Sequence, residues 1–274
     1  MSTSNPLANP DFVVATTIEE AGDGLHLYTF PDGFRCYSHT NNVSEINLIY
    51  NEVFVKEEYL GDTLSLAECR YAVDVGANIG IFTLFAKLRN PALIIHAFEP
   101  IKATYDVLVK NIELHGLTDV YPHNCALGNQ ESATSTLTFF PNAAGLTTAY
   151  PESKAPLKRH LTNILGKETA DIIFDAPQVH KVPSRTLSAV IDEFGIPAID
   201  FLKIDTEGEE WAILQGIAPR HYPIIRQIAA EIHSDALMAA IQPLLTGHGF
   251  CVVADVGIGN VEGVDSNNLY ATRE

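Results

Sequence analysis

The hydrophobic positions of this chain change their spacing at residue 71. From there on, short apolar runs alternate with longer segments in which apolar residues recur every three or four positions. The first pattern predicts buried strands, and the second predicts amphipathic helices. The predicted strands lie at 71–76, 92–100, 119–128, 135–140, 198–205, 227–233, 251–257 and 267–274, and the predicted helices at 79–90, 101–116, 185–195, 209–217 and 234–249.

Strands that alternate with helices are joined by right-handed crossovers into a sheet that is covered on both faces. The sequence therefore predicts an α/β fold with a Rossmann-like, doubly wound and mostly parallel sheet. In such folds, ligands bind beyond the carboxyl ends of the strands. Polar residues at the strand ends are thus the first candidates for a functional site.

Two parts of the chain depart from this alternation. Residues 24–40 alternate around a Pro-Asp-Gly turn and predict a hairpin, and residues 43–60 begin with a helical pattern. We therefore predict an N-terminal extension, hairpin plus helix, at 1–66 and an α/β domain at 67–274. Residues 149–180 interrupt the domain and predict a lid-like insertion with one or two short helices near the strand ends.

Charge and cysteine usage narrow the function classes. The 274 residues carry 17 lysines and arginines against 34 acids, a net charge of −17. Such a surface repels phosphate backbones and anionic lipids, so we expect neither nucleic acid nor a membrane as partner. No apolar run approaches the ~20 residues that span a bilayer, and the N-terminus does not resemble a signal peptide. Four widely spaced cysteines without CxxC spacing predict a cytoplasmic protein with reduced thiols.

The loop that follows the first strand of the domain, VDVGANIG, is poor in side chains. Gly76 and Gly80 allow a ligand to approach the backbone where a strand turns into a helix. A dinucleotide fingerprint, GxGxxG, would need glycine at Asn78 and Ile81 as well, which argues against a nicotinamide dehydrogenase. Glu99 ends the next strand, 19 residues after Gly80, where a carboxylate can accept hydrogen bonds from a ribose diol.

The segments VDVGANIG, AFEP, NCALG and FLKIDTEGEE together resemble the class I, S-adenosylmethionine-dependent methyltransferases of the FkbM family, over roughly residues 45–255. The resemblance implies a seven-stranded sheet with a reversed last strand, S-adenosylmethionine as cofactor and O-methylation as the typical reaction. By position, it implies that the cofactor's methionine, sugar and adenine parts are bound by Asp74, Gly76, Ala77, Asn78, Gly80, Glu99, Pro100, Ile101, Asn124, Cys125, Ala126 and Asp205. It does not fix the methyl acceptor.

Three residues are candidates for the chemistry. Asp205 and Glu207 follow a buried strand, and His233 ends the next one. A hydroxyl acceptor benefits from a base, and a histidine with a pKa near ~6.5 suits that role at neutral pH. Two alternatives remain: Glu207 as a stabiliser of a helix N-terminus, and His233 as a structural residue. With Glu231, these groups could also bind a divalent metal, but we predict no obligatory metal.

The leading hypothesis is an O-methyltransferase that acts on a hydroxyl of a small molecule, such as a natural product or other secondary metabolite. A first alternative is an enzyme of the same fold that methylates a sugar, a lipid, a carrier-bound chain or a nitrogen. A second alternative is a scaffold that keeps the fold without catalysis. The sequence leaves the oligomeric state open, with a homodimer among the options.

Overall fold

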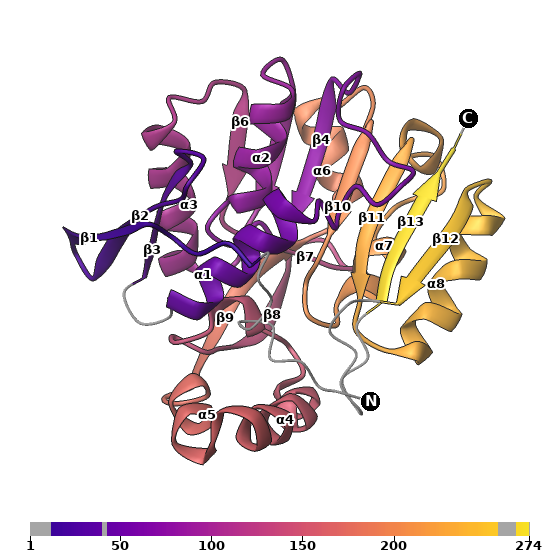
Figure 1. Cartoon of the computed structure of the whole chain (residues 1–274). Coiled ribbons are helices and arrows are strands. Elements are labelled where there is room, and N and C mark those ends of the chain that lie inside the picture. Colours follow the sequence, from indigo (N-terminus) through magenta and orange to yellow (C-terminus); the bar gives the residue numbers. More distant parts are fainter. Residues whose placement is uncertain (1–11, 40–42, 257–266, 274) are drawn as a thin grey trace.

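The computed structural model describes residues 12–39, 43–256 and 267–273. Its centre is a seven-stranded sheet (Figure 1). In spatial order, its strands are β12 (Cys251–Val256), β13 (Asn267–Thr272), β11 (Gln227–Ile232), β10 (Phe201–Ile204), β4 (Tyr71–Val75), β5 (Ile94–Phe98) and β6 (Val120–His123).

The directions of the strands confirm the predicted topology. β4, β5, β6, β10 and β11 pair in parallel, whereas β13 runs antiparallel to both of its neighbours, β11 and β12. The sheet is thus mostly parallel, with its last strand reversed. The carboxyl ends of the five parallel strands consequently meet along one rim of the sheet, where most of the candidate residues lie.

Helices cover both faces of the sheet and bury two separate cores. The first core receives α2 (Ile81–Arg89) and α3 (Lys102–Leu114), and the second receives α6 (Leu187–Phe194), α7 (Glu210–Gln215) and α8 (Asp235–Gly247). Neighbouring residues of β10 point to opposite sides, so that Phe201 belongs to the first core and Leu202 to the second. A short 3₁₀ turn, η5 (Tyr222–Ile224), precedes β11.

The N-terminal extension contains the predicted hairpin and helix and one further strand. β2 (Leu25–Thr29) and β3 (Arg35–His39) form the hairpin, and β1 (Thr17–Gly22) pairs with β2. The prediction missed β1 because all its residues are exposed, so it lacks the alternation of a half-buried strand. The helix consists of α1 (Val43–Tyr50) and a π-helical turn, η2 (Asn51–Val55). The extension shares a core with α2, and the domain boundary at residue 66 stays a prediction.

A second sheet, in the order β7–β9–β8, carries the insertion. The segment 119–128, predicted as one strand, forms β6 and then β7 (Ala126–Leu127) in the second sheet, and 135–140 corresponds to β8 (Ala133–Phe139). β9 (Gln178–Arg185) was not predicted, because half of its residues are exposed and Val182 is its one buried apolar residue. Between β8 and β9 lie η3 (Ala144–Leu146), η4 (Pro151–Lys154), α4 (Ala155–Leu165) and α5 (Lys167–Ile173). The helices α4 and α5 form a lobe at the lower end of Figure 1.

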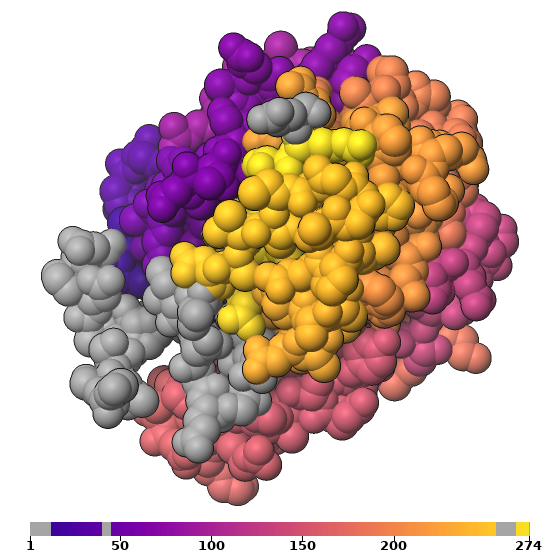
Figure 2. Space-filling view, turned by 90° about the vertical axis from the view of Figure 1, so that its right-hand side faces the viewer, coloured from indigo at the N-terminus to yellow at the C-terminus, as the bar shows by residue number. Residues whose placement is uncertain are grey.

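The extension also contacts the C-terminal strands. Figure 2 shows the purple surface of the extension beside the orange and yellow C-terminal surface. The hydroxyl of Tyr270 in β13 donates a hydrogen bond of 2.5 Å to the backbone oxygen of Glu58. Among the described residues, no helix combines the length and the apolar character needed to cross a bilayer.

Candidate functional site

The loop after β4 passes close to β10, and this explains its glycines. Gly76 has a φ of +78°, and a Cβ atom there would overlap the carbonyl oxygen of Asp205. Gly80 has a φ of +93°, and its Cβ would lie 2.6 Å from Cδ1 of Leu108. At Gly76 the neighbouring atom is backbone, so the protein's own packing excludes a side chain. At Gly80 the neighbour is the end of a leucine side chain, and the left-handed backbone is the main constraint. The interpretation of the sequence, that these glycines let a ligand approach the backbone, stays a prediction.

Glu99, at the end of β5, holds the same loop. Its buried carboxylate accepts hydrogen bonds from the backbone amides of Asn78 (3.1 Å) and Ile101 (2.8 Å). Asn124, at the end of β6, donates to the carbonyl oxygens of Glu99 (2.9 Å) and Pro100 (3.0 Å). Burial raises the pKa of Glu99 to about 7, although both amides favour the carboxylate. Three strand ends are thereby connected at one rim.

Lys203, in β10, links two acids of the site. Its Nζ atom lies 3.3 Å from Oδ1 of Asp74 and 3.6 Å from Oδ2 of Asp205, and it donates to the carbonyl oxygen of Gly76 at 2.8 Å. Asp74 has no exposed surface, and its Oδ2 accepts a hydrogen bond from the Thr83 hydroxyl at 2.7 Å. Any contribution of the Asp74 side chain to ligand binding therefore passes through Lys203 and the loop.

Asp205 is held through one of its two carboxylate oxygens. Its side chain is 23% exposed, and its Oδ2 accepts a hydrogen bond of 2.7 Å from the hydroxyl of Tyr59. The Tyr59 ring lies over the ammonium group of Lys203, 5.1 Å from nitrogen to ring centroid. The other carboxylate oxygen of Asp205, Oδ1, makes no hydrogen bond within the described part of the chain. Asp205 therefore offers one oxygen to a further partner.

Glu207 and His233 belong to a closed ionic cluster. The Nε2 atom of His233 lies 3.1 Å from Glu207, and its Nδ1 atom lies 3.1 Å from Glu210. Lys154, from η4, pairs with the same carboxylate oxygen of Glu207. Both nitrogens of the imidazole ring are thus occupied by carboxylates, and the insertion supplies a second cation.

These contacts determine the charges of the cluster. Burial alone would lower the pKa of His233, but Glu207 and Glu210 outweigh it and hold the pKa well above its ordinary value. Burial would raise the pKa of Glu207, but His233 and Lys154 outweigh it and lower this pKa to about 2. His233 is therefore charged at neutral pH and has no lone pair for a proton. This geometry argues against the hypothesis that His233 is the base.

The comparison with known families decides the class. A family model described as the methyltransferase FkbM domain matches residues 74–250, from the end of β4 to the start of β12. The chain belongs to the FkbM methyltransferase family. It is thus a methyltransferase that uses S-adenosylmethionine as methyl donor, as the sequence resemblance implied.

Relatives of this FkbM-family methyltransferase cover most of its length. It is 35% identical to Methyltransferase sdnD of Sordaria araneosa, over 77% of this chain and 84% of that protein. It is also 35% identical to the 31-O-demethyl-FK506 methyltransferase FkbM of Streptomyces tacrolimicus, over 78% of this chain and 85% of that protein. The AMB antimetabolite synthetase AmbE of Pseudomonas aeruginosa is 30% identical over 94% of this chain, a match that spans 13% of the synthetase.

The rim of this FkbM-family methyltransferase suits the polar groups of S-adenosylmethionine. Asn78 has a φ of +50°, and its buried Oδ1 atom has no hydrogen-bond partner among the described residues. Such an atom requires a donor, and the cofactor's ammonium group is one. Glu99 adds a carboxylate at the strand tip that can accept hydrogen bonds from ribose hydroxyls. The residues present therefore fit the cofactor.

Several other residues implied by the resemblance lie in packed positions. Ala77, Ile101, Cys125 and Ala126 are buried, and Ile101 and Ala126 share a small core with residues of β8 and β9. Pro100 is partly exposed. Packing at the strand ends accounts for the four buried residues, and their contacts to the cofactor remain proposals.

The FkbM-family site also contains a group of potential metal ligands. Asp205, Glu231 and His233 each offer one ligand atom, and these atoms lie within 4.8 Å of one another. Divalent cations favour the carboxylate oxygens of this group, but His233 would have to lose its proton and leave Glu207 or Glu210 before it could bind a metal. The prediction that no metal is obligatory stays a prediction, and chelation tests it.

Sequence reasoning missed three residues of the site. Tyr59 comes from the extension and Lys154 from the insertion, so no spacing in the sequence connects either with the strand ends. Glu210 was accessible to inference, because it belongs to the same segment, FLKIDTEGEE, as Asp205 and Glu207 and begins α7.

Lys154→Met is expected to destabilise the protein by about 1–3 kcal/mol, because it leaves the largely buried Glu207 carboxylate with one cation instead of two. The matched control is Lys158→Met in α4. Lys158 pairs with Asp171, and both side chains are partly exposed, so the loss of this pair should destabilise the protein by less than ~1 kcal/mol. Urea unfolding at neutral pH measures both. Equal stability of the two variants would contradict a structural role of the pair between insertion and site.

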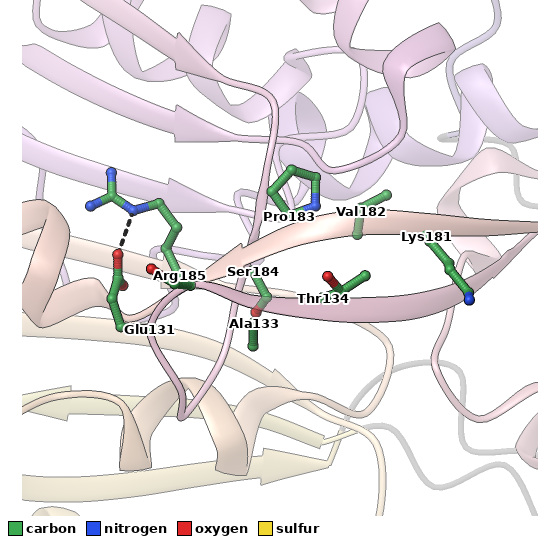
Figure 3. A pocket seen from close by; sticks show the side chains of 9 residues that line it. Glu131, Ala133, Thr134, Lys181, Val182, Pro183, Ser184 and Arg185 are labelled. Atoms are coloured by element: carbon green, nitrogen blue, oxygen red, sulfur yellow. Dashed lines mark hydrogen bonds and ion pairs between the residues drawn. The ribbon is translucent and has the colours of Figure 1, made fainter.

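A surface groove lies along β8 and β9, away from the predicted site residues (Figure 3). Its charged residues include Arg185, whose Nε donates to Glu131 at 3.0 Å and whose guanidinium also pairs with Glu193 at 2.7 Å. These pairings satisfy the arginine within the protein, and the groove contains none of the residues implied by the resemblance.

Proposed function

We propose that this methyltransferase transfers the methyl group of S-adenosylmethionine to a hydroxyl of a small molecule, a natural product or other secondary metabolite. The observation that carries the proposal is the Oδ1 atom of Asp205, which lies at the rim beside the glycine loop and makes no hydrogen bond within the described residues. The name of the Streptomyces relative supports it, because that enzyme is named for an O-demethyl substrate. A cytoplasmic location and a small-molecule partner belong to the same proposal.

The chain's own residues would bind and orient the donor. The cofactor supplies an electrophilic methyl group on a sulfonium. Asn78 and the backbone of the loop from Gly76 to Gly80 would hold its methionine part, and Glu99 would accept hydrogen bonds from its ribose. Alignment of the acceptor with the methyl group can contribute ~7–11 kcal/mol to such a reaction.

Asp205 is the best candidate for receiving the acceptor's hydroxyl proton. Glu207 is paired with two cations, and its pKa of about 2 makes it a weak base. His233 is charged and has both nitrogens occupied. We therefore propose that these two residues fix the wall of the acceptor site, while Asp205 contacts the acceptor. A positioned base typically contributes ~10²–10⁴-fold to the rate.

Glu99→Gln is expected to weaken binding of S-adenosylhomocysteine by about 1–3 kcal/mol, because an amide replaces an ionised acceptor. The pKa of Glu99 is about 7, and ribose hydroxyls favour its ionised form, so the affinity of the wild type should rise as the pH increases through about 7. The variant should lose this rise. Calorimetry at several pH values measures both effects, with Glu113→Gln, in an exposed position of α3, as the control. A pH rise that persists in Glu99→Gln would remove Glu99 from the cofactor site.

A screen of acceptors tests the proposed function. Purified protein and S-adenosylmethionine are incubated with hydroxylated polyketides, with amines, and with the same hydroxylated acyl groups as carrier-bound thioesters, each with and without EDTA. We expect a methylated free hydroxyl compound in both conditions. Methylation of amines alone would contradict the proposal, and loss of activity with EDTA that Mg²⁺ restores would contradict the absence of an obligatory metal.

The carrier-bound alternative has one observation in its favour. Nearly the whole chain matches a short part of a protein named as a synthetase, AmbE. If this chain acts on carrier-bound substrates, the thioesters in the screen should be methylated and the free acceptors should not.

A further inference from the structure

The N-terminal extension lies outside the matched family domain but reaches the site. Three of its polar residues, Glu45, Glu52 and Tyr59, lie in α1, in η2 and shortly after η2. Glu45 accepts a hydrogen bond of 2.6 Å from the backbone amide of Gly145 in the insertion. Tyr59 reaches Asp205. The extension therefore connects the insertion with the carboxyl end of β10.

Tyr59 is held in place by its ring as well as by its hydroxyl. The ring packs edge-on against Phe82 of α2, with 5.3 Å between centroids, and lies over the Lys203 ammonium group. Its hydroxyl and Lys203 both approach the same atom of Asp205, Oδ2, at 2.7 Å and 3.6 Å. The two contacts hold one carboxylate oxygen and leave the other available.

The surroundings of Asp205 keep Tyr59 a hydrogen-bond donor. Besides Lys203 and Tyr59, the charged groups that face Asp205 are Glu52 of η2, Glu231 of β11 and His233. Burial, followed by the charges of Asp205, Glu231 and Glu52, holds the pKa of Tyr59 well above its ordinary value. The phenol therefore keeps its proton at all physiological pH values, so it can orient Asp205 but cannot itself act as a base.

We propose that Tyr59 is a positioning residue of the methyl-acceptor site, whose hydroxyl fixes Asp205 so that the second carboxylate oxygen faces the acceptor hydroxyl. This inference rests on the proposed function. As the acceptor oxygen forms its bond to the methyl carbon, its O–H bond breaks and the proton passes to Asp205, while the electron pair of the carbon–sulfur bond stays on sulfur. The extension is thus required for turnover and not for binding of the cofactor.

The test compares Tyr59→Phe with Tyr222→Phe. Phenylalanine keeps the ring contacts and removes one hydroxyl. Tyr222 is the matched control, because it is buried and its hydroxyl donates a hydrogen bond of 2.8 Å to the backbone oxygen of Leu214. Both residues belong to the second core, and this hydrogen bond does not involve Asp205. With an acceptor from the screen, Tyr59→Phe should lower kcat about tenfold or more, with the affinity for S-adenosylhomocysteine unchanged within about twofold. Tyr222→Phe should leave kcat unchanged.

A second measurement needs no acceptor, so it separates this inference from the proposed function. Crystal structures of wild type, Tyr59→Phe and Tyr222→Phe show the orientation of the Asp205 carboxylate. Because the Tyr59 hydroxyl donates to Oδ2, we expect one orientation in wild type and in Tyr222→Phe, and a turned or multiply oriented carboxylate in Tyr59→Phe.

Three outcomes would overturn the inference. One is an Asp205 carboxylate that keeps its wild-type orientation in Tyr59→Phe. Another is a kcat equal to that of Tyr222→Phe. The third is loss of the fold or of cofactor binding in Tyr59→Phe, which would make the hydroxyl a structural group or part of the cofactor site. Absence of every methylated product in the wild type, with the expected change in the orientation of the Asp205 carboxylate, would overturn the proposed function and leave the positioning of Asp205 supported.

Discussion

Gly76→Ala is expected to destabilise the protein by about 4 kcal/mol or more. A left-handed backbone conformation costs alanine roughly 1–2 kcal/mol. In addition, the new Cβ atom would overlap the carbonyl oxygen of Asp205, which is backbone and cannot move by changing a rotamer. β4 and β10 are hydrogen-bonded neighbours, so relief of the overlap requires the two strands to separate at the rim. Urea unfolding measures the loss, and in the remaining folded fraction the binding of S-adenosylhomocysteine should fall as well.

Gly116→Ala is the control that separates the two causes. Gly116 has a similar backbone conformation, with a φ of +57°, but no atom lies within 4 Å of the position of its Cβ. It should cost only the conformational part, roughly 1–2 kcal/mol. If Gly76→Ala proved as stable as Gly116→Ala, the close approach of the loop to Asp205 would be contradicted.

His233→Gln is expected to cost about 3–5 kcal/mol at pH 6, because it leaves the buried carboxylates of Glu210 and Glu207 without the cation between them. The matched control is His221→Gln. His221 is buried, makes a hydrogen bond of 2.9 Å with the Ser188 hydroxyl and lies 3.3 Å from the exposed Asp192. His221→Gln should cost ~1 kcal/mol. Comparable losses in both variants would show that the carboxylate cluster does not depend on the charge of His233.

The pH dependence of this effect follows from the pKa values of the cluster. The folded pKa of His233 lies above its unfolded value of ~6.5, so its contribution is fully present below about pH 6.5 and is lost as the pH rises through the folded pKa. The pKa of Glu207 is lowered to about 2 from 4.5, so its contribution is present above that ordinary value and is lost as the pH falls towards 2. The stability difference between wild type and His233→Gln should therefore shrink from pH 6 to pH 9. A constant difference would contradict a charged His233.

The central sheet could be predicted from the sequence because buried parallel strands and amphipathic helices leave a clear pattern of apolar residues. β1 is exposed throughout and β9 has one buried apolar residue, so neither strand leaves such a pattern and both were missed. The second sheet was missed for another reason: the apolar runs of β7 and β8 indicate strands, but a run does not tell which neighbour a strand will pair with.

The same limit applies to the site. Asp205, Glu207 and His233 were predicted to share one region, and the structure brings them together, because each follows a strand of the same rim. Their roles depended on partners from distant segments. Lys154 and Glu210 decide the charge of Glu207 and His233, and Tyr59 decides which oxygen of Asp205 is available. Neither charge nor orientation is visible in the spacing of the three residues themselves.

The most direct test of the proposed function follows the methyl group itself. S-adenosylmethionine with a ¹³C-labelled methyl group is incubated with the protein and the panel of hydroxylated natural products, and NMR identifies the atom that carries the label. We expect a labelled methyl ether with wild type, at least ~10²-fold slower formation with Asp205→Asn, and cofactor binding close to normal in that variant. A label that appears on nitrogen, or a methyl ether formed equally fast by Asp205→Asn, would contradict hydroxyl methylation at the carboxyl end of β10.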